Sequence, residues 1–204
     1  SDQVIEPQEK FIELISTVDE LARKDVIVTF GIVPNKPETG YGYLQVEFDD
    51  ETKSHRVIKF IEKPSLEIAE KLLEQGSHLW NSGIFAFNSK TIFSEIDSHA
   101  PELIEAASMS FQELQDQFSA LTPISIDYAV MERSNNIVVI PLPLTWSDLG
   151  SWDSVFDALE KDSNQNVKVG NVHDIDTKNS LIYGSKRLIS TIGLEDVIIV
   201  ETDD

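Results

Sequence analysis

The chain has 204 residues, which is enough for one domain of ordinary size with a small appendage. Sixteen basic residues against 36 acidic ones give a net charge of -20, which argues against nucleic acid or an anionic membrane surface as a partner. The absence of cysteine excludes disulfides, thiolate nucleophiles and cysteine zinc sites.

The sequence has none of the segments that direct a protein to or through a membrane. No apolar run approaches the ~20 residues that cross a bilayer, and the N-terminus lacks the layout of a signal peptide. We therefore expect a cytoplasmic protein. Both ends of the sequence have the pattern of an interrupted strand, so we expect a fragment of something longer.

Up to about residue 161 the pattern alternates between helices and strands. Apolar residues recur at helical spacing where helices are expected and form short runs or alternations where strands are expected. The expected helices cover residues 7–24, 65–76, 89–97 and 149–161, with two more opening at Pro101 and Ser110, and the expected strands cover 25–33, 44–48, 57–61, 83–87 and 137–140.

After Asn164 the pattern changes to short strands separated by Gly, Asp and Asn, at 167–169, 181–183, 188–192 and 197–200. The sequence therefore predicts a layered α/β sheet over residues 1–163 and a β-rich appendage over residues 164–204.

Polar side chains lie at the ends of two of the predicted strands. Glu62 and Lys63 end one strand, where Pro64 stops the ladder, and Asn81 lies one crossover later. A lysine after a strand is by default a solvated strand end. If the two strand ends are adjacent, however, one cation for a phosphate and two groups for hydroxyls share a rim. This arrangement predicts a pocket for a phosphorylated sugar.

Two further segments have a structural and a functional interpretation. The two glycines at 40 and 42 fit a tight turn, or a place where backbone N–H groups approach a ligand closely. Asp148 fits a helix cap, or a ligand for Mg²⁺, which takes one or two protein carboxylates. Asp2 would be the second carboxylate. None of the four histidines has a partner at ligand spacing, and we assign none to chemistry.

Six motifs in order carry a resemblance that runs over nearly the whole chain. They are TFGIVP (29–34), PETGYGY (37–43), FIEKP (60–64), WNSGIF (80–85), SIDYAVME (125–132) and WSDLGSW (146–152). Together they resemble the mannose-1-phosphate guanylyltransferase family, which includes single-function enzymes and bifunctional ones with a C-terminal phosphomannose isomerase domain.

The resemblance implies a nucleotidyltransferase with a Rossmann-like sheet that makes GDP-mannose and pyrophosphate from GTP and mannose 1-phosphate with Mg²⁺, a step of polysaccharide biosynthesis. It implies that Lys63 binds the sugar phosphate, that Glu62 and Asn81 bind mannose hydroxyls, and that Gly42 lies beside the sugar. It also implies that Asp148 holds the metal together with Asp2. Gln3 stands where the family has histidine after that aspartate.

One departure concerns the nucleotide. The family's glycine-rich loop, with its Arg and Lys for the nucleotide phosphates, is absent from these 204 residues, so we expect this chain alone to be inactive. Two alternatives stay open: another hexose-1-phosphate nucleotidyltransferase using UTP or dTTP, and a non-catalytic regulatory or scaffold subunit. The base preference, a downstream isomerase domain and the oligomeric state, a homodimer included, are also open.

Overall fold

The computed structural model describes residues 3–49 and 51–203. The chain forms two compact units. The central unit is Pro7–Leu144, and the terminal unit comprises the residues up to Glu6 together with those from Thr145 onward.

The strands of the central unit form a barrel that closes in the order β2-β5-β3-β4-β6. Each of these strands contributes apolar side chains to one buried hydrophobic core. The strands are β2 (Ile27–Ile32), β3 (Tyr43–Glu47), β4 (His55–Ile61), β5 (His78–Ala86) and β6 (Ile137–Pro141).

The sheet order corrects one expectation about the rim. β3 lies between β4 and β5 and pairs with both of them in antiparallel fashion. The sequence pattern suggested that the ends of β4 and β5 are adjacent. The structure shows that β3 separates them. Tyr43 at the start of β3 faces Ile61 on one side and Trp80 on the other, so the loop before β3 bridges the two strands.

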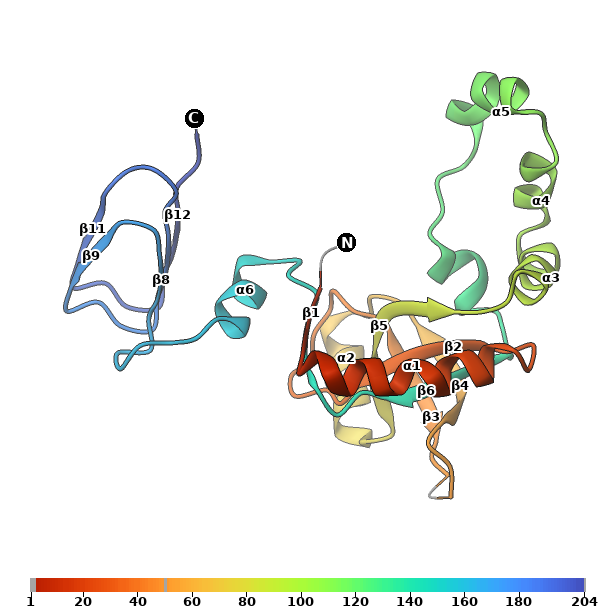
Figure 1. The fold of residues 1–204 in the computed structure, drawn as a ribbon, viewed down its shortest axis with the longest axis horizontal. Helices are drawn as coiled ribbons and strands as arrows, with labels where there is room; N and C mark the ends of the chain where they lie inside the picture. The colour runs from red at the N-terminus through yellow and green to blue at the C-terminus, as the bar shows by residue number, and fades with distance from the viewer. Residues whose placement is uncertain (1–2, 50, 204) are drawn as a thin grey trace. The chain divides into compact units, whose positions relative to one another are not determined.

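The helices of the central unit begin and end close to the expected residues. The longest, α1, is amphipathic: it packs Phe11 against Phe30 of β2, with ring centroids 5.2 Å apart, and buries Val18 and Ala22. In Figure 1, α4 and α5 (green) extend away from the barrel. The α-helices are α1 (Gln8–Ala22), α2 (Leu66–Gln75), α3 (Ser89–His99), α4 (Pro101–Ala107) and α5 (Phe111–Gln117), followed by the short 3₁₀ helix η1 (Phe118–Ala120).

β5 begins five residues before the strand expected at 83–87. Gly83 looked like the start of a strand, but it lies inside β5 with a φ of 72°, close to the point where the pairing with β2 shifts register. A glycine inside a strand commonly marks such an irregularity. Trp80, Asn81 and Ser82 consequently belong to the interior of β5 and are buried.

A π-helical turn that sequence periodicity did not predict lies before β6. This turn, η2 (Asp127–Met131), buries Ala129, Val130 and Met131 in the same core as β4 and β6. Burying a Val or Met side chain stabilises a fold by roughly 1.5–3 kcal/mol, so Val130 and Met131 hold η2 in the core.

The terminal unit consists of short strands and one short helix. β1 (Val4–Glu6) pairs with β7 (Thr145–Ser147) in antiparallel fashion, and α6 covers Trp152–Ala158. The helix expected at 149–161 starts later because Leu149 has a φ of 49° and the Ser151 side chain caps the first turn.

The β-rich tail is confirmed, and its strands pair in parallel. β10 lies between β8 and β12, and β11 pairs with β9, a strand that the sequence pattern missed. The strands are β8 (Val167–Val169), β9 (Val172–Ile175), β10 (Leu181–Tyr183), β11 (Ile189–Ile192) and β12 (Ile198–Val200).

Candidate functional site

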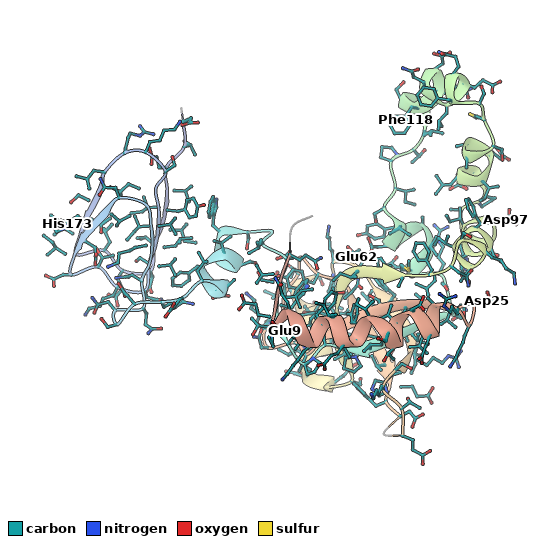
Figure 2. All side chains as sticks on the ribbon, viewed as in Figure 1. Glu9, Asp25, Glu62, Asp97, Phe118 and His173 are labelled. Carbon is teal, nitrogen blue, oxygen red and sulfur yellow. The ribbon has the colours of Figure 1, made fainter. Side chains whose placement is uncertain are left out.

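The turn that follows β4 carries the predicted acid–base pair. The Nζ atom of Lys63 lies 3.9 Å from Oε1 of Glu62. The Lys63 side chain is 59% exposed, whereas that of Glu62, labelled in Figure 2, is only 9% exposed. Lys63 has a φ of 43°, a conformation that a residue with a Cβ adopts only when its surroundings impose it. The turn therefore presents a solvent-accessible cation beside a nearly buried carboxyl group.

The loop before β3 joins this turn to β5. The N–H of Lys63 donates to the carbonyl of Tyr41 at 3.2 Å, and the N–H of Asn81 donates to the carbonyl of Gly42 at 2.7 Å. An ideal Cβ on Gly42 would lie 2.7 Å from Oε2 of Glu62. The structure thus brings together four of the predicted residues, Gly42, Glu62, Lys63 and Asn81, although they come from three different segments of the chain.

The side chain of Asn81 is oriented from inside the barrel. Its Oδ1 accepts a hydrogen bond from the hydroxyl of Thr29 at 2.9 Å, and Thr29 is completely buried. The same hydroxyl lies 3.0 Å from the carbonyl oxygen of Ile84. Because the Asn81 amide is planar and its oxygen is engaged by Thr29, its N–H groups point away from Thr29. Those N–H groups are suited to donate to a hydroxyl of a ligand.

Two acidic residues of the SIDYAVME motif act on Glu62. Burial is the largest cause that raises the pKa of Glu62; together with the charges of Asp127 and Glu132, and against that of Lys63, it brings the pKa to about 7. Near neutral pH this carboxyl group therefore exists in both forms, so it both donates to and accepts from hydroxyl groups. Neither acid is among the site residues predicted from the sequence. An acid at each end of the apolar YAVM segment was the signal available.

Aromatic side chains line the neighbouring backbone. The rings of Tyr41 and Trp80 meet edge to face with centroids 5.2 Å apart, and Tyr43 donates its hydroxyl to the carbonyl of Glu38 at 2.9 Å. Burial raises the pKa of Tyr43, so this hydroxyl stays protonated and remains a hydrogen-bond donor. These contacts hold the loop 38–43 over β5 and thereby set the position of Gly42.

Asp148 belongs to the terminal unit and follows β7 directly. Its Oδ1 accepts the N–H of Gly150 at 3.1 Å, while the N–H of Leu149 donates to the hydroxyl of Ser147 at 3.2 Å. The carboxylate is therefore oriented by a tight loop rather than by a helix. Asp2, the other predicted metal ligand, lies outside the described residues, and a convergence of Asp148 with Lys63 stays a prediction.

Asp148 offers a hard oxygen ligand of the kind that a divalent cation binds. Within residues 3–49 and 51–203, no group of three or more His, Cys, Asp or Glu side chains is arranged to hold a metal ion. Mg²⁺ commonly uses only one or two carboxylates and completes its shell with phosphate and water. The oriented carboxylate of Asp148 suits that chemistry.

Among the described residues, 3–49 and 51–203, no helix is both long enough and apolar enough to span a bilayer.

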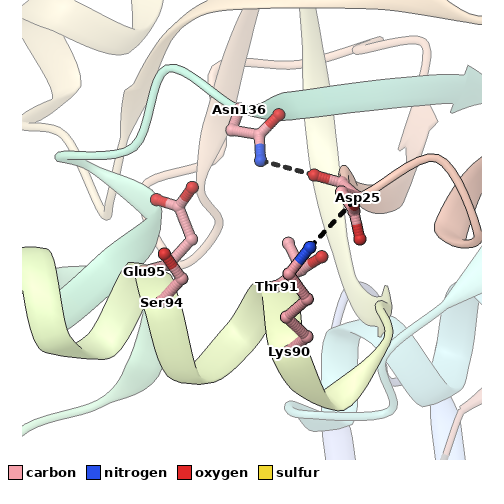
Figure 3. Close-up of a pocket in the computed structure, with 6 residues that line it drawn as sticks. All are labelled: Asp25, Lys90, Thr91, Ser94, Glu95 and Asn136. Carbon is pink, nitrogen blue, oxygen red and sulfur yellow. Dashed lines mark hydrogen bonds and ion pairs between the residues drawn. The ribbon is translucent and has the colours of Figure 1, made fainter.

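A separate small pocket lies at the N-terminal ends of β2 and β6. It has a volume of about 160 Å³ and contains none of the predicted site residues (Figure 3). The side-chain amide of Asn136 donates to the carbonyl of Asp25 at 2.8 Å, and the Asp25 carboxylate pairs with Lys90 at 3.5 Å. These three polar residues of the pocket therefore interact with one another. The pocket is lined by Asp25, Lys90, Thr91, Ser94, Glu95 and Asn136.

Comparison with known protein families gives two matches. The family described as "Nucleotidyl transferase" matches residues 1–165, and the family described as "MannoseP isomerase/GMP-like beta-helix domain" matches residues 170–204. A domain boundary at residues 163–164 itself stays a prediction.

Curated proteins and solved structures agree with these matches. The chain is 38% identical to "Mannose-1-phosphate guanylyltransferase" of Salmonella montevideo, covering 100% of this chain and 46% of that protein. It is 36% identical to "Alginate biosynthesis protein AlgA" of Pseudomonas aeruginosa, covering 100% of this chain and 45% of that protein. The chain therefore spans about half the length of these curated relatives.

A crystal structure named as mannose-1-phosphate geranyltransferase, from Thermus thermophilus, has the same fold. It superposes with a TM-score of 0.89 at 29% identity, covering 100% of this chain and 61% of that one. The expected nucleotidyltransferase-type α/β fold with a β-rich C-terminal region is thereby confirmed.

Proposed function

Because this chain belongs to the nucleotidyl transferase family, we propose that its protein transfers GMP from GTP to mannose 1-phosphate. The products are GDP-mannose and pyrophosphate. The observation that carries the proposal is the grouping of Gly42, Glu62, Lys63 and Asn81 around the turn after β4. The names of the curated relatives support the choice of substrates.

The four residues supply the contacts that a sugar phosphate needs. The ammonium group of Lys63, which is exposed, binds the phosphate as a point charge. The carboxyl group of Glu62 and the amide of Asn81 bind hydroxyls of the sugar. Gly42, beside the sugar, leaves room for the Glu62 carboxyl group, because a Cβ there would lie 2.7 Å from Oε2 of Glu62. These contacts orient a phosphate oxygen of mannose 1-phosphate for attack on the α-phosphorus of GTP.

The reaction requires mainly that the protein align the two substrates and neutralise the charge of their phosphates. A new bond forms between the sugar-phosphate oxygen and the α-phosphorus of GTP, and the bond to the β-phosphate bridge breaks, so that pyrophosphate leaves with its electron pair. Lys63 reduces the repulsion between the two anionic substrates. In a chain of net charge -20 this local cation matters, because the overall field repels both of them.

Mg²⁺ is the metal that we assign to the reaction, with Asp148 as a ligand. Bound to substrate phosphates, it would neutralise their negative charge. The Asp148 carboxylate is held for this role by the N–H of Gly150. We propose Asp2 as the second carboxylate. A homodimer and a cytoplasmic location stay predictions alongside these assignments.

The test is turnover by the protein expressed from the complete reading frame that encodes this chain. With mannose 1-phosphate and Mg²⁺, we expect GDP-mannose from GTP and little product from UTP or dTTP. Glucose 1-phosphate is the competing substrate, and efficient turnover of it with UTP or dTTP would replace our assignment by a different hexose-1-phosphate nucleotidyltransferase. No turnover with any pair, together with binding to a catalytic partner, would indicate a regulatory subunit.

Two substitutions connect the activity to the site. We expect Lys63→Gln to raise the KM for mannose 1-phosphate by about tenfold to a hundredfold, since a charge-assisted contact to phosphate is lost. Lys71→Gln is the matched control, because Lys71 pairs with Glu67 on the exposed face of α2. Asp148→Asn is expected to raise the Mg²⁺ concentration needed for half-maximal rate. The 204-residue chain by itself is expected to give no turnover.

A further inference from the structure

The two N–H groups of the turn after β4 are both bonded to groups outside β4. The N–H of Glu62 donates to Oε1 of Glu132 at 2.9 Å, and the N–H of Lys63 donates to the carbonyl of Tyr41. Pro64, the next residue, has no N–H. Lys63 meanwhile has a left-handed backbone with a φ of 43°, which is unfavourable for any residue with a Cβ. The turn therefore keeps its shape because its partners hold it.

Glu132 is well placed to be such a partner. It follows η2 immediately, and its own N–H donates to the carbonyl of Asp127 at 2.9 Å. The three residues before it, Ala129, Val130 and Met131, are buried in the barrel core. Core packing thus fixes the backbone from which the Glu132 side chain reaches Glu62, although 70 positions separate the two residues in sequence.

We propose that Glu132 is a positioning residue: its carboxylate fixes the turn that presents Glu62 and Lys63 to the sugar phosphate. This inference rests on the function proposed above, and it assigns a role to a residue that does not itself contact the substrate. The sugar-phosphate affinity then depends on the hydrogen bond from Glu62 to Glu132, not only on the side chains that bind the ligand.

The charge of Glu132 has a second effect that can be separated from the hydrogen bond. The charged groups that face Glu62 are Asp127, Lys63 and Glu132, and the two acids add to the effect of burial in raising the pKa of Glu62. Glu132→Gln keeps an oxygen that accepts the N–H but removes the charge. Glu132→Ala removes both, so the pair of variants distinguishes the bond from the charge.

The experiment measures mannose 1-phosphate binding to the complete protein by titration calorimetry, together with the KM for each substrate. We expect Glu132→Ala to weaken mannose 1-phosphate binding about tenfold and to leave the KM for GTP unchanged. Glu132→Gln should retain affinity close to that of the unmodified protein, while the inflection of affinity with pH moves to lower pH. Titration of the sugar phosphate itself is common to all variants and cancels in the comparison.

Glu74→Gln is the control, because it removes one carboxylate from an exposed position of α2. Unchanged binding in Glu132→Ala, or an equal loss in Glu74→Gln, would overturn the proposal. If Glu132→Ala lowers the melting temperature so far that it cannot be assayed, Glu132→Asp decides, because its shorter side chain draws the carboxylate back from the N–H of Glu62 while keeping the charge. Affinity for mannose 1-phosphate equal to that of the unmodified protein then contradicts the proposal. An unmodified protein that binds mannose 1-phosphate but makes no GDP-mannose refutes the proposed function alone, and the binding comparison still judges Glu132.

Discussion

Oε2 of Glu62 lies 2.7 Å from the point that a Cβ on Gly42 would occupy. The same point lies 3.1 Å from the ring of Phe60. Gly42 does not have a left-handed backbone, so it is the neighbouring Glu62 carboxylate, and not the local conformation, that requires the absence of a side chain. The glycine and the carboxyl group of the candidate site therefore depend on one another.

Gly42→Ala is expected to displace the Glu62 carboxylate and shift the Phe60 ring slightly. The end of a glutamate side chain moves easily, so the free energy of unfolding should fall by only about 1–2 kcal/mol. The KM for mannose 1-phosphate should rise about tenfold, because a displaced group no longer meets the sugar hydroxyls. Steady-state kinetics and urea unfolding measure the two effects.

Gly40→Ala, two residues earlier in the same loop, is the matched control. A Cβ there meets only Oε1 of Glu38 at an ordinary 3.5 Å. This variant should bind mannose 1-phosphate like the unmodified protein. Equal behaviour of the two variants would mean that the loop as a whole, and not the contact with Glu62, accounts for the effect.

Replacing Thr29 tests the orientation of Asn81. Thr29→Val removes the buried hydroxyl that donates to Oδ1 of Asn81, and we expect the free energy of unfolding to fall by about 1–3 kcal/mol in urea. The affinity for mannose 1-phosphate should fall as well, because the Asn81 amide is free to rotate. Thr29→Ser keeps the hydroxyl and loses a methyl group, so it should lose stability but not affinity. Comparable affinity losses in both variants would contradict this account.

Glu62 should make the stability of the central unit depend on pH. Its pKa of about 7 lies above the ordinary value of 4.5, so its contribution to stability is fully present below about 4.5 and is lost as pH rises through 7. Glu62→Gln carries no charge at any pH. We therefore expect it to be roughly 1–3 kcal/mol more stable than the unmodified protein at about pH 8, and to show no such advantage at about pH 5. Thermal unfolding across this range is the measurement, and an advantage that does not grow with pH would refute the assignment.

Glu201 should have the opposite pH dependence in the terminal unit. Its two oxygens accept the N–H groups of Ser185, Lys186 and Arg187, and its Oε1 pairs with the Arg187 guanidinium at 2.9 Å. The Lys186 N–H and the Arg187 side chain lower its pKa to about 2. Its contribution to stability is then present above about 4.5 and is lost as pH falls toward 2.

Glu201→Gln should accordingly lower the melting temperature of the terminal unit at neutral pH, by an amount that shrinks as the solution is acidified. Asp203→Asn is the control, because Asp203 and Lys186 form an exposed ion pair of the kind that contributes little. A melting temperature that is as sensitive to Asp203→Asn as to Glu201→Gln would show that general surface charge is responsible.

Local signals in the sequence identified most elements of the fold. The spacing of apolar residues predicted α1, and Gly76, with a φ of 66°, ends α2 as expected. The same reasoning failed where a residue is compatible with two different local structures. Gly83 resembled the start of a strand but lies inside β5, and Leu149 has helical spacing but a left-handed backbone. Propensity does not distinguish these cases, because the pairing of β5 with β2 decides the first and the hydrogen bond of the Leu149 N–H to Ser147 belongs to the loop of the second.

What the sequence determined by itself was the set of chemical groups: a glutamate and a lysine after one strand, an asparagine before another, and a glycine in the loop that precedes both. Their periodicity and neighbours are local, and local rules describe them. Only the tertiary structure decided that β3 lies between β4 and β5, that the loop at Gly42 bridges the two, and that Glu132 reaches Glu62 from 70 residues away. Closure of the barrel and burial of η2 bring these groups together, and the raised pKa of Glu62 is a product of that burial.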